Sequence, residues 1–243
     1  MRIVAIVQAR MGSSRLPGKA LRDILGRTML ARVVRRAKRS ALIDRLVVAT
    51  TENYADNAIV SECESLGVSS FRGSEDDVLD RYYQAARAFH ANCIVRITSD
   101  CPLIDPEIID SVVQAFLDGG PDYASNTIIS TYPRGLDVEV FSFEALEEAW
   151  HNASRDFEHV HVTPYIYQHP ELFHKLAVTG EKDWSRYRWT VDTKEDLDLV
   201  RAIYAKMDRD DLFSWRAVLE LFEREPDLAD INRHIRQKSL EEC

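Results

Sequence analysis

Residues 8–19 read Gln8-Ala9-Arg10-Met11-Gly12-Ser13-Ser14-Arg15-Leu16-Pro17-Gly18-Lys19. This stretch follows an apolar run at residues 3–7, which is typical of a strand buried on both faces. A helical pattern opens after it, at residues 28–34. The pattern predicts a loop rich in Gly, Ser, Arg and Lys at the end of a first strand. In open α/β sheets, ligands bind at that place.

The side chains of this loop suit phosphate. Its two glycines let the backbone approach a ligand closely, and its two serines add hydroxyl donors. Its three cations, Arg10, Arg15 and Lys19, supply charged donors for a polyphosphate. The alternative is a solvated surface loop with scattered charge, and the density of cations and glycines argues against it.

The spacing differs from two common nucleotide-binding motifs. A P-loop reads GxxxxGK[ST], whereas here five residues separate Gly12 from Gly18 and Ala20 follows Lys19. The hydroxyl that would hold Mg²⁺ in a P-loop is therefore missing. The chain also has no GxGxxG motif, so we exclude both an ATPase-type loop and a dinucleotide-binding loop.

Composition limits the function classes. The chain has 243 residues, of which 45% are hydrophobic, and we expect a single domain at residues 1–243. Its net charge is −9, so we do not expect nucleic-acid binding. From Arg2 to Arg39, however, every charged residue except Asp23 is basic. This part of the chain can attract an anion although the whole chain is acidic.

The cysteines and the apolar segments indicate the compartment. No CxxC pair or zinc-binding spacing is present, and we expect free thiols in a reducing environment. The four cysteines are Cys63, Cys93, Cys101 and Cys243. We see no signal peptide and no apolar stretch long enough to cross a membrane. We therefore expect a cytoplasmic protein without a membrane partner.

Apolar periodicity predicts alternating strands and helices. We expect strands at residues 45–50, 68–71, 93–98, 122–126 and 136–141, and one ending at Val191. We expect helices at residues 28–40, 52–66, 106–117 and 142–152, and further helices after Thr193 and Ser214. This order is typical of a doubly wound α/β fold with a mostly parallel sheet.

The helix at residues 28–40 has a basic outer face. We interpret its cations as solvated surface charge; they are Arg32, Arg35, Arg36 and Lys38.

Residues 71–82 form a second candidate segment. Ser74 is a good N-cap for the helix that follows, with acids in its first turn, and capping alone would explain it. The functional alternative is that Arg72, Gly73 and Ser74 lie beside a nucleotide at the end of a strand.

Two aspartates stand at strand ends without a structural role. Asp105 precedes Pro106 as a helix N-cap, but Asp100 is not needed as a cap. Thr193 and Asp196 form a capping box, which leaves Asp192 unexplained. Carboxylates in such places can hold Mg²⁺ against substrate phosphates.

Two further groups have both a functional and a structural explanation. Ordinary edge-strand polarity explains Arg134 and Asp137, and only a resemblance to a known family implies that they face an acceptor. His159 and His161 do not share a helix face, so we do not expect them to bind a metal together.

These segments resemble the sugar-activating cytidylyltransferases, the family of the CMP-KDO and CMP-acylneuraminate synthetases. The spore-coat polysaccharide biosynthesis (SpsF-like) branch is the most similar. The resemblance rests on residues 8–19, 71–82, 100–104 and 192–197. It implies a nucleotide-diphospho-sugar transferase fold of GT-A-like, Rossmann-like type. It also implies that residues 122–178 form an acceptor-site and dimerisation lobe, and that the protein is a homodimer.

The resemblance implies transfer of CMP from CTP to an acidic or phosphorylated sugar, with release of pyrophosphate, for surface polysaccharide or glycoconjugate biosynthesis. It implies catalytic roles for Arg10, Arg15 and Lys19, and Mg²⁺ as cofactor on Asp100 and Asp192. The implied nucleotide-binding residues are Ala9, Arg10, Gly12, Ser13, Ser14, Arg15, Lys19, Arg72, Gly73, Ser74, Asp77, Thr98 and Ser99. The implied acceptor-binding residues are Arg134, Asp137 and Glu139. The choice of cytosine rests on the resemblance alone.

Two other functions stay open. One is a glycosyltransferase that uses a nucleotide-sugar on the same fold. It would need an Asp-x-Asp motif, and Pro102 stands two residues after Asp100 instead. The other is a non-catalytic nucleotide-binding protein, which we would expect to lack Lys19 or one of the two aspartates.

Overall fold

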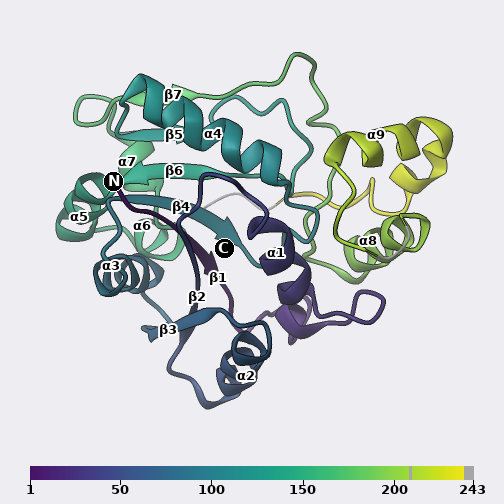
Figure 1. Cartoon of the computed structure of the whole chain (residues 1–243), viewed down its shortest axis with the longest axis horizontal. Helices are drawn as coiled ribbons and strands as arrows, with labels where there is room; N and C mark the ends of the chain where they lie inside the picture. The colour runs from purple at the N-terminus through teal and green to yellow at the C-terminus, as the bar shows by residue number, and fades with distance from the viewer. Residues whose placement is uncertain (208–209, 238–243) are drawn as a thin grey trace.

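A seven-stranded sheet runs through the computed structural model, which describes residues 1–207 and 210–237 (Figure 1). The strand order is β3-β2-β1-β4-β6-β5-β7. The strands are β1 Ile3–Gln8, β2 Arg45–Thr51, β3 Ser69–Gly73, β4 Cys93–Thr98, β5 Tyr123–Ser125, β6 Glu139–Ser142 and β7 Lys175–Ala177. Strands β1 to β4 pair in parallel, and β6 is antiparallel to both of its neighbours. The doubly wound, mostly parallel α/β fold is confirmed.

Helices cover both faces of the sheet, because β1 is apolar on both sides. The helices are α1 Met29–Ala37, α2 Asn57–Ser65, α3 Val78–Ala88, α4 Pro106–Gly119, α5 Phe143–Asn152, α6 Asp156–His161, α7 Pro164–Gln168, α8 Lys194–Lys206 and α9 Trp215–Arg224. Ile3, Ala5 and Val7 pack with residues of α1, α4, α8 and α9, whereas Val4 and Ile6 pack with residues of α3 and α5. In the described chain, no helix combines the length and the apolar content that a membrane span requires.

Residues 122–178 add β5, β6 and β7 to the same sheet, together with the helices α5 to α7. They are therefore continuous with the rest of the fold. Their role as a dimerisation lobe stays a prediction.

The prediction for the basic face of α1 is wrong at two positions. Arg32 and Arg36 are fully buried. Arg32 Nη1 pairs with Asp211 Oδ1 at 3.0 Å, and Arg36 Nε donates to Ile104 O at 2.7 Å. Asp211 lies in the segment that follows α8, and Ile104 lies in the turn before α4. Because the partners are far away in the sequence, the helical pattern alone does not reveal them.

The first turn of α3 also differs from the prediction. Asp77 is the N-cap, and its Oδ1 accepts from Asp80 N at 2.8 Å. The hydroxyl of Ser74 accepts from Asp77 N at 3.0 Å instead. Ser74 thus stabilises the turn before the helix and Asp77 caps the helix itself, so α3 begins later in the chain than Ser74 predicts.

Two predicted strands are shorter or absent. Leu136 and Val138 are buried but precede β6, because the side chain of Asn126 bonds to Leu136 O and Val138 N in place of a strand. Residues 187–191 are not a strand; Arg188 forms only an isolated bridge with Arg134.

Candidate active site

The loop after β1 is held in shape by a buried carboxylate. Asp56 Oδ1 accepts from Met11 N at 2.7 Å, while its Oδ2 accepts from Thr51 N at 3.2 Å. Gly18 then adopts a φ of 67°, which favours glycine, and its N–H donates to Met11 O. A short 3-10 turn begins at Lys19 and directs this side chain back toward the sheet.

The segment that carries Asp192 is also placed by a glycine. Gly135 has a φ of 106°, and a Cβ atom there would lie 2.6 Å from Thr190 N. This close approach lets Arg134 N donate to Tyr187 O and Trp189 N donate to Arg134 O across the bridge between Arg134 and Arg188. Val191 N then donates to Asp100 O at 2.8 Å, which brings the two predicted metal ligands together.

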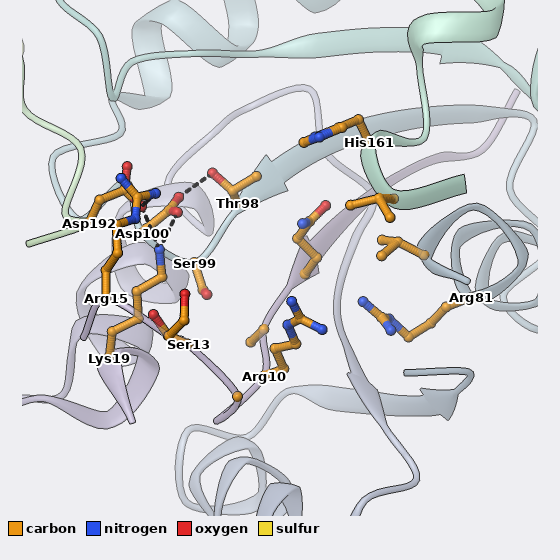
Figure 2. A pocket seen from close by; sticks show the side chains of 16 residues that line it. Arg10, Ser13, Arg15, Lys19, Arg81, Thr98, Ser99, Asp100, His161 and Asp192 are labelled. Carbon is orange, nitrogen blue, oxygen red and sulfur yellow. Dashed lines mark hydrogen bonds and ion pairs between the residues drawn. The ribbon is translucent and has the colours of Figure 1, made fainter. Parts of the chain in front are cut away.

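Lys19 lies between the two aspartates (Figure 2). Its Nζ is 2.7 Å from Asp100 Oδ2 and 3.0 Å from Asp192 Oδ1. Arg15 Nη2 lies 2.9 Å from the same Asp192 oxygen, and Thr98 Oγ1 donates to Asp100 Oδ1 at 2.5 Å. Five predicted site residues, from three separate segments of the chain, thus contact one another.

The charges in this group stabilise one another. Burial raises the pKa of Asp100, but Lys19 and Thr98 outweigh it and lower the pKa to about 2. Burial lowers the pKa of Lys19, and attraction to both aspartates outweighs it and raises that pKa. Both groups are therefore charged at neutral pH.

A cavity of about 330 Å³ opens beside this group (Figure 2). Nine of the predicted nucleotide-binding residues line it: Ala9, Arg10, Gly12, Ser13, Ser14, Arg15, Lys19, Thr98 and Ser99. The other four predicted residues, Arg72, Gly73, Ser74 and Asp77, are not among its lining residues.

Those four residues have structural partners. The guanidinium of Arg72 donates to Thr51 O, Asn53 O and Asn57 Oδ1, which fixes the end of β3. Gly73 ends that strand, and Ser74 and Asp77 shape the start of α3. Their contact with a nucleotide stays a prediction.

Two cations lie across the cavity from Lys19. Arg10 comes from the loop, and Arg81 comes from α3 (Figure 2). Arg81 is 1% exposed and donates to Ser74 O. Burial is the largest cause of its lowered pKa, and the nearby Arg10 contributes. An elongated anion would find positive charge at both ends of this cavity.

The sequence analysis missed several lining residues. They are Gln8, Val78, Arg81, Val160 and His161. Arg81 stands one helical turn after Asp77, which is the only local signal for it. His161 reaches the cavity from α6, and its neighbour His159 bonds to Asp77 Oδ2 at 2.9 Å instead.

A second cavity of about 710 Å³ adjoins the first. The two aspartates stand at the junction, because the residues that line both cavities are Gln8, Arg15, Thr98, Asp100, His161 and Asp192. The three predicted acceptor-binding residues, Arg134, Asp137 and Glu139, all line this second cavity.

These three residues have different surroundings. Arg134 is exposed. Burial raises the pKa of Asp137 to about 6, which attraction to Arg134 only partly opposes. Glu139 is buried and pairs with Arg96, and it also accepts from Tyr123 OH and Thr163 Oγ1, each at 2.6 Å.

The donor set at the junction fits Mg²⁺ bound together with a polyphosphate. No group of three or more His, Cys, Asp or Glu side chains among the described residues could enclose a metal. Mg²⁺ commonly takes one or two carboxylates and completes its shell with phosphates and waters. Asp100 and Asp192 provide two carboxylates beside a cationic cavity, which suits that mode of binding.

Solved structures define the class of protein as a nucleotidyltransferase. The chain matches a cytidylyltransferase from Leptospira borgpetersenii over 98% of its own length and 100% of the other, with a TM-score of 0.91 and 33% identity. It also matches a CMP:2-keto-3-deoxy-manno-octonic acid synthetase complexed with CTP, with a TM-score of 0.64 and 21% identity. That match covers 85% of this chain and 100% of the other.

The sequence model of the cytidylyltransferase family matches residues 4–222, and the chain belongs to this family. An uncharacterised protein of Methanocaldococcus jannaschii is 41% identical over 100% of this chain and 99% of its own. Spore coat polysaccharide biosynthesis protein SpsF of Bacillus subtilis is 37% identical over 93% of this chain and 96% of its own. The family predicted from the motifs is confirmed.

Proposed function

We propose that the protein transfers CMP from CTP to an acidic or phosphorylated sugar and releases pyrophosphate. The observation that carries this proposal is the position of Lys19. Its ammonium lies between Asp100 and Asp192 at the junction of two cavities. One cavity has cations suited to a triphosphate, and the other is large enough for a sugar.

In the proposed reaction, an acceptor oxygen attacks the α-phosphorus of CTP; a hydroxyl acceptor gives up its proton to water, and a phosphate acceptor attacks through an ionised oxygen. The bond between the α-phosphorus and the bridging oxygen breaks, and pyrophosphate leaves with that oxygen. Arg10, Arg15 and Lys19 would bind the β- and γ-phosphates and stabilise the negative charge of the leaving group. Such catalysis depends mainly on position and electrostatics.

Asp100 and Asp192 would hold Mg²⁺ in the proposed complex. When bound there, the ion would neutralise charge on the phosphates and orient them. Lys19, Arg15 and Thr98 hold the two carboxylates at the junction of the two cavities. Arg134 and Asp137 would contact the acceptor, and the hydroxyls around Glu139 would shape the far wall.

The choice of CTP is supported by the family and by the solved neighbour that contains CTP. A role in surface polysaccharide or glycoconjugate synthesis is supported by the similarity to SpsF. We also propose a cytoplasmic enzyme that works as a homodimer.

Pyrophosphate release tests the proposal. The protein would be incubated with Mg²⁺, one of the four common nucleoside triphosphates, and a panel of acidic sugars and sugar phosphates. We expect release only with CTP together with an acceptor, and formation of the CMP conjugate of that acceptor detected by mass spectrometry. Transfer of a sugar from a CMP-sugar without pyrophosphate release would favour the glycosyltransferase. Binding of CTP without any turnover would favour the non-catalytic protein.

A further inference from the structure

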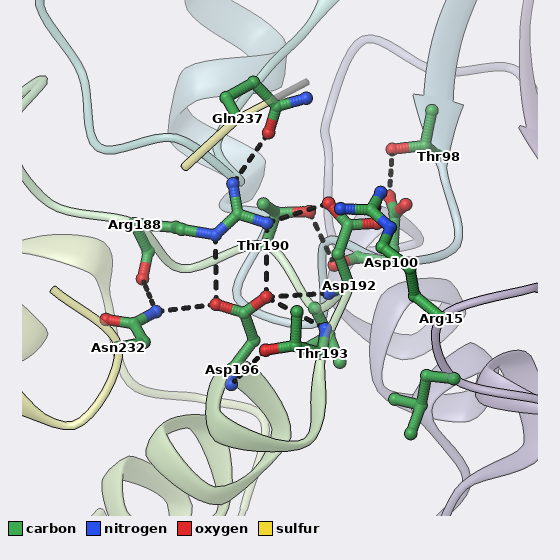
Figure 3. A network of polar contacts seen from close by, with 12 residues as sticks. Arg15, Thr98, Asp100, Arg188, Thr190, Asp192, Thr193, Asp196, Asn232 and Gln237 are labelled. Carbon is green, nitrogen blue, oxygen red and sulfur yellow. Dashed lines mark hydrogen bonds and ion pairs between the residues drawn. The ribbon is translucent and has the colours of Figure 1, made fainter. Parts of the chain in front are cut away.

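Arg188 contacts the side chain of Asp192, and it also contacts Gln237, which lines the second cavity. Its Nη2 is 2.8 Å from Asp192 Oδ2, whereas Lys19 and Arg15 approach the other oxygen, Oδ1 (Figure 3). Arg188 is not among the lining residues of either cavity. The two oxygens of Asp192 are therefore held by different cations, and Oδ1 is the one directed to the cavity side.

Asp196 fixes the guanidinium of Arg188. Arg188 Nε lies 3.0 Å from Asp196 Oδ1, and Nη2 lies 3.1 Å from Oδ2, which is a two-pronged contact. Asp196 is fully buried at the start of α8 and also accepts from Asp192 N at 2.9 Å. One carboxylate thus holds both the backbone of Asp192 and the arginine that bonds to its side chain.

The C-terminal part of the chain completes this support (Figure 3). Asn232 Nδ2 donates to Asp196 Oδ1 at 2.8 Å and to Arg188 O at 2.9 Å. Arg188 Nη1 donates to Gln237 Oε1 at 2.7 Å. Asn232 is 4% exposed, so its contact with Asp196 is an interior one, whereas Gln237 is exposed. The sequence analysis found no role for this segment.

Helix capping does not explain the arrangement. Thr193 and Asp196 form the capping box of α8 without Arg188. Burying a charged side chain is costly unless it has a partner of opposite charge, and Asp196 already provides that partner for Arg188. Yet Arg188 also contacts Asp192, and residues from the far end of the chain hold Arg188 in place.

We propose that Arg188 is a positioning residue for Asp192, supported by Asp196, Asn232 and Gln237. By occupying Oδ2, Arg188 keeps Oδ1 turned toward the site where the proposed function places a metal ion. The inference rests on the proposed function for the role of Asp192. It adds that the affinity for the metal depends on the C-terminal segment at residues 232–237. Partners of this kind commonly change metal affinity by about 10- to 100-fold.

The test measures Mn²⁺ binding to the whole protein saturated with a CTP analogue that has a methylene bridge between the α- and β-phosphates. Free Mn²⁺ is followed by electron paramagnetic resonance, so turnover is not needed. We expect Arg188→Met to weaken Mn²⁺ binding about 10- to 100-fold. Arg188→Lys should recover only part of this loss, because lysine cannot make the two-pronged contact. Asn232→Ala should shift the affinity in the same direction by a smaller factor.

Matched controls separate positioning from general damage. Arg186→Met and Arg233→Ala change exposed arginines next to the network, and Mn²⁺ affinity should stay within about twofold. Binding of the analogue in EDTA and the circular dichroism spectrum should be unchanged in Arg188→Met. A purely structural role would lower the melting temperature without this selective loss of Mn²⁺.

Three outcomes would overturn the inference. If Arg188→Met folds and binds Mn²⁺ within twofold of the wild type while Asp192→Asn loses binding, only the role of Arg188 is wrong. If Asp192→Asn also keeps its Mn²⁺ affinity, the metal role in the proposed function is wrong as well. If Arg188→Met does not fold, Asn232→Ala and Gln237→Ala decide the question, and unchanged Mn²⁺ affinity in both would overturn it.

Discussion

Lys19 and Asp100 are 81 residues apart in the sequence, and Lys19 Nζ lies 2.7 Å from Asp100 Oδ2. The same ammonium lies 3.0 Å from Asp192 Oδ1. A single cation therefore joins the loop after β1, the end of β4 and the start of α8. Removing any member of this group leaves the others with unbalanced charge at the junction of the two cavities.

Asp100→Asn should abolish turnover without unfolding the protein. The amide keeps the shape of the carboxylate but loses the charge that would attract Mg²⁺ and Lys19. We expect the rate of pyrophosphate release to fall about 100-fold or more. Asp118→Asn, on the exposed surface of α4, is the control and should retain the wild-type rate. Unchanged turnover in folded Asp100→Asn would remove the metal assignment.

Lys19→Met should lower both activity and stability. Asp100 and Asp192 would then face each other without their shared cation, and such a loss typically costs about 3 kcal/mol. Unfolding in urea would measure the loss, and added Mg²⁺ should restore part of the stability. Lys194→Met changes a lysine whose side chain is 80% exposed and serves as the control. Equal stability of the two variants would contradict the importance of the Lys19 contacts.

The contribution of Asp100 to stability should depend on pH. Its pKa is lowered from 3.8 to about 2 in the folded protein, so the unfolded chain takes up this proton more readily. The stabilisation is complete above the unfolded value and is lost as pH falls from about 4 to about 2. The difference in unfolding free energy between the wild type and Asp100→Asn should shrink over that range. A constant difference would show that the pKa of Asp100 is not lowered.

Asp137 should have the opposite dependence. Its pKa is raised from 3.8 to about 6, so the folded protein retains this proton longer than the unfolded chain does. Ionisation of Asp137 therefore lowers stability as pH rises from about 4 to about 6. Asp137→Asn should be more stable than the wild type at pH 7, by about 1–2 kcal/mol, with no gain at pH 4. Thermal unfolding of the wild type and Asp137→Asn at pH 7 and pH 4 measures this difference in stability. A gain in stability at pH 4 alone would contradict the prediction.

Asp211→Asn should destabilise the fold strongly. Asp211 is buried and pairs with Arg32 at 3.0 Å and with Arg35 at 2.8 Å. Because Arg32 is fully buried, losing this carboxylate leaves a guanidinium charge in the interior, at a cost of about 3–5 kcal/mol. Asp210→Asn changes the exposed neighbour and should cost much less in urea unfolding. Similar costs for the two variants would mean that the buried pair contributes little.

Much of the fold is readable from local patterns. The apolar run of β1 predicts a central strand, and Thr28, Asp105, Ser142 and Thr193 each cap the helix expected after them. Each cap bonds to a backbone N–H only a few residues away, so both partners of the contact lie within one short segment of the sequence. β7, at Lys175–Ala177, was not predicted.

The candidate site was predictable in part. The loop at residues 8–19 and the aspartates at positions 100 and 192 have signals in their own segments, and the structure brings them together. His161 has no such signal and Arg81 has only its place after Asp77, because their positions in the cavity depend on how α6 and α3 pack on the sheet. Arg188 resembles an ordinary charge until Asp196 and Gln237 are placed beside it.

Local sequence thus settled the order of most strands and helices and the caps of several helices, and it predicted which loop would bind phosphate. Family membership also followed from short motifs, since each is a run of adjacent residues. Only the tertiary structure decided which charges are buried and which of them meet, as Lys19 meets Asp100 and Asp192. The physical reason is that a contact between distant segments depends on the packing of all the elements between them, and no single segment encodes that sum.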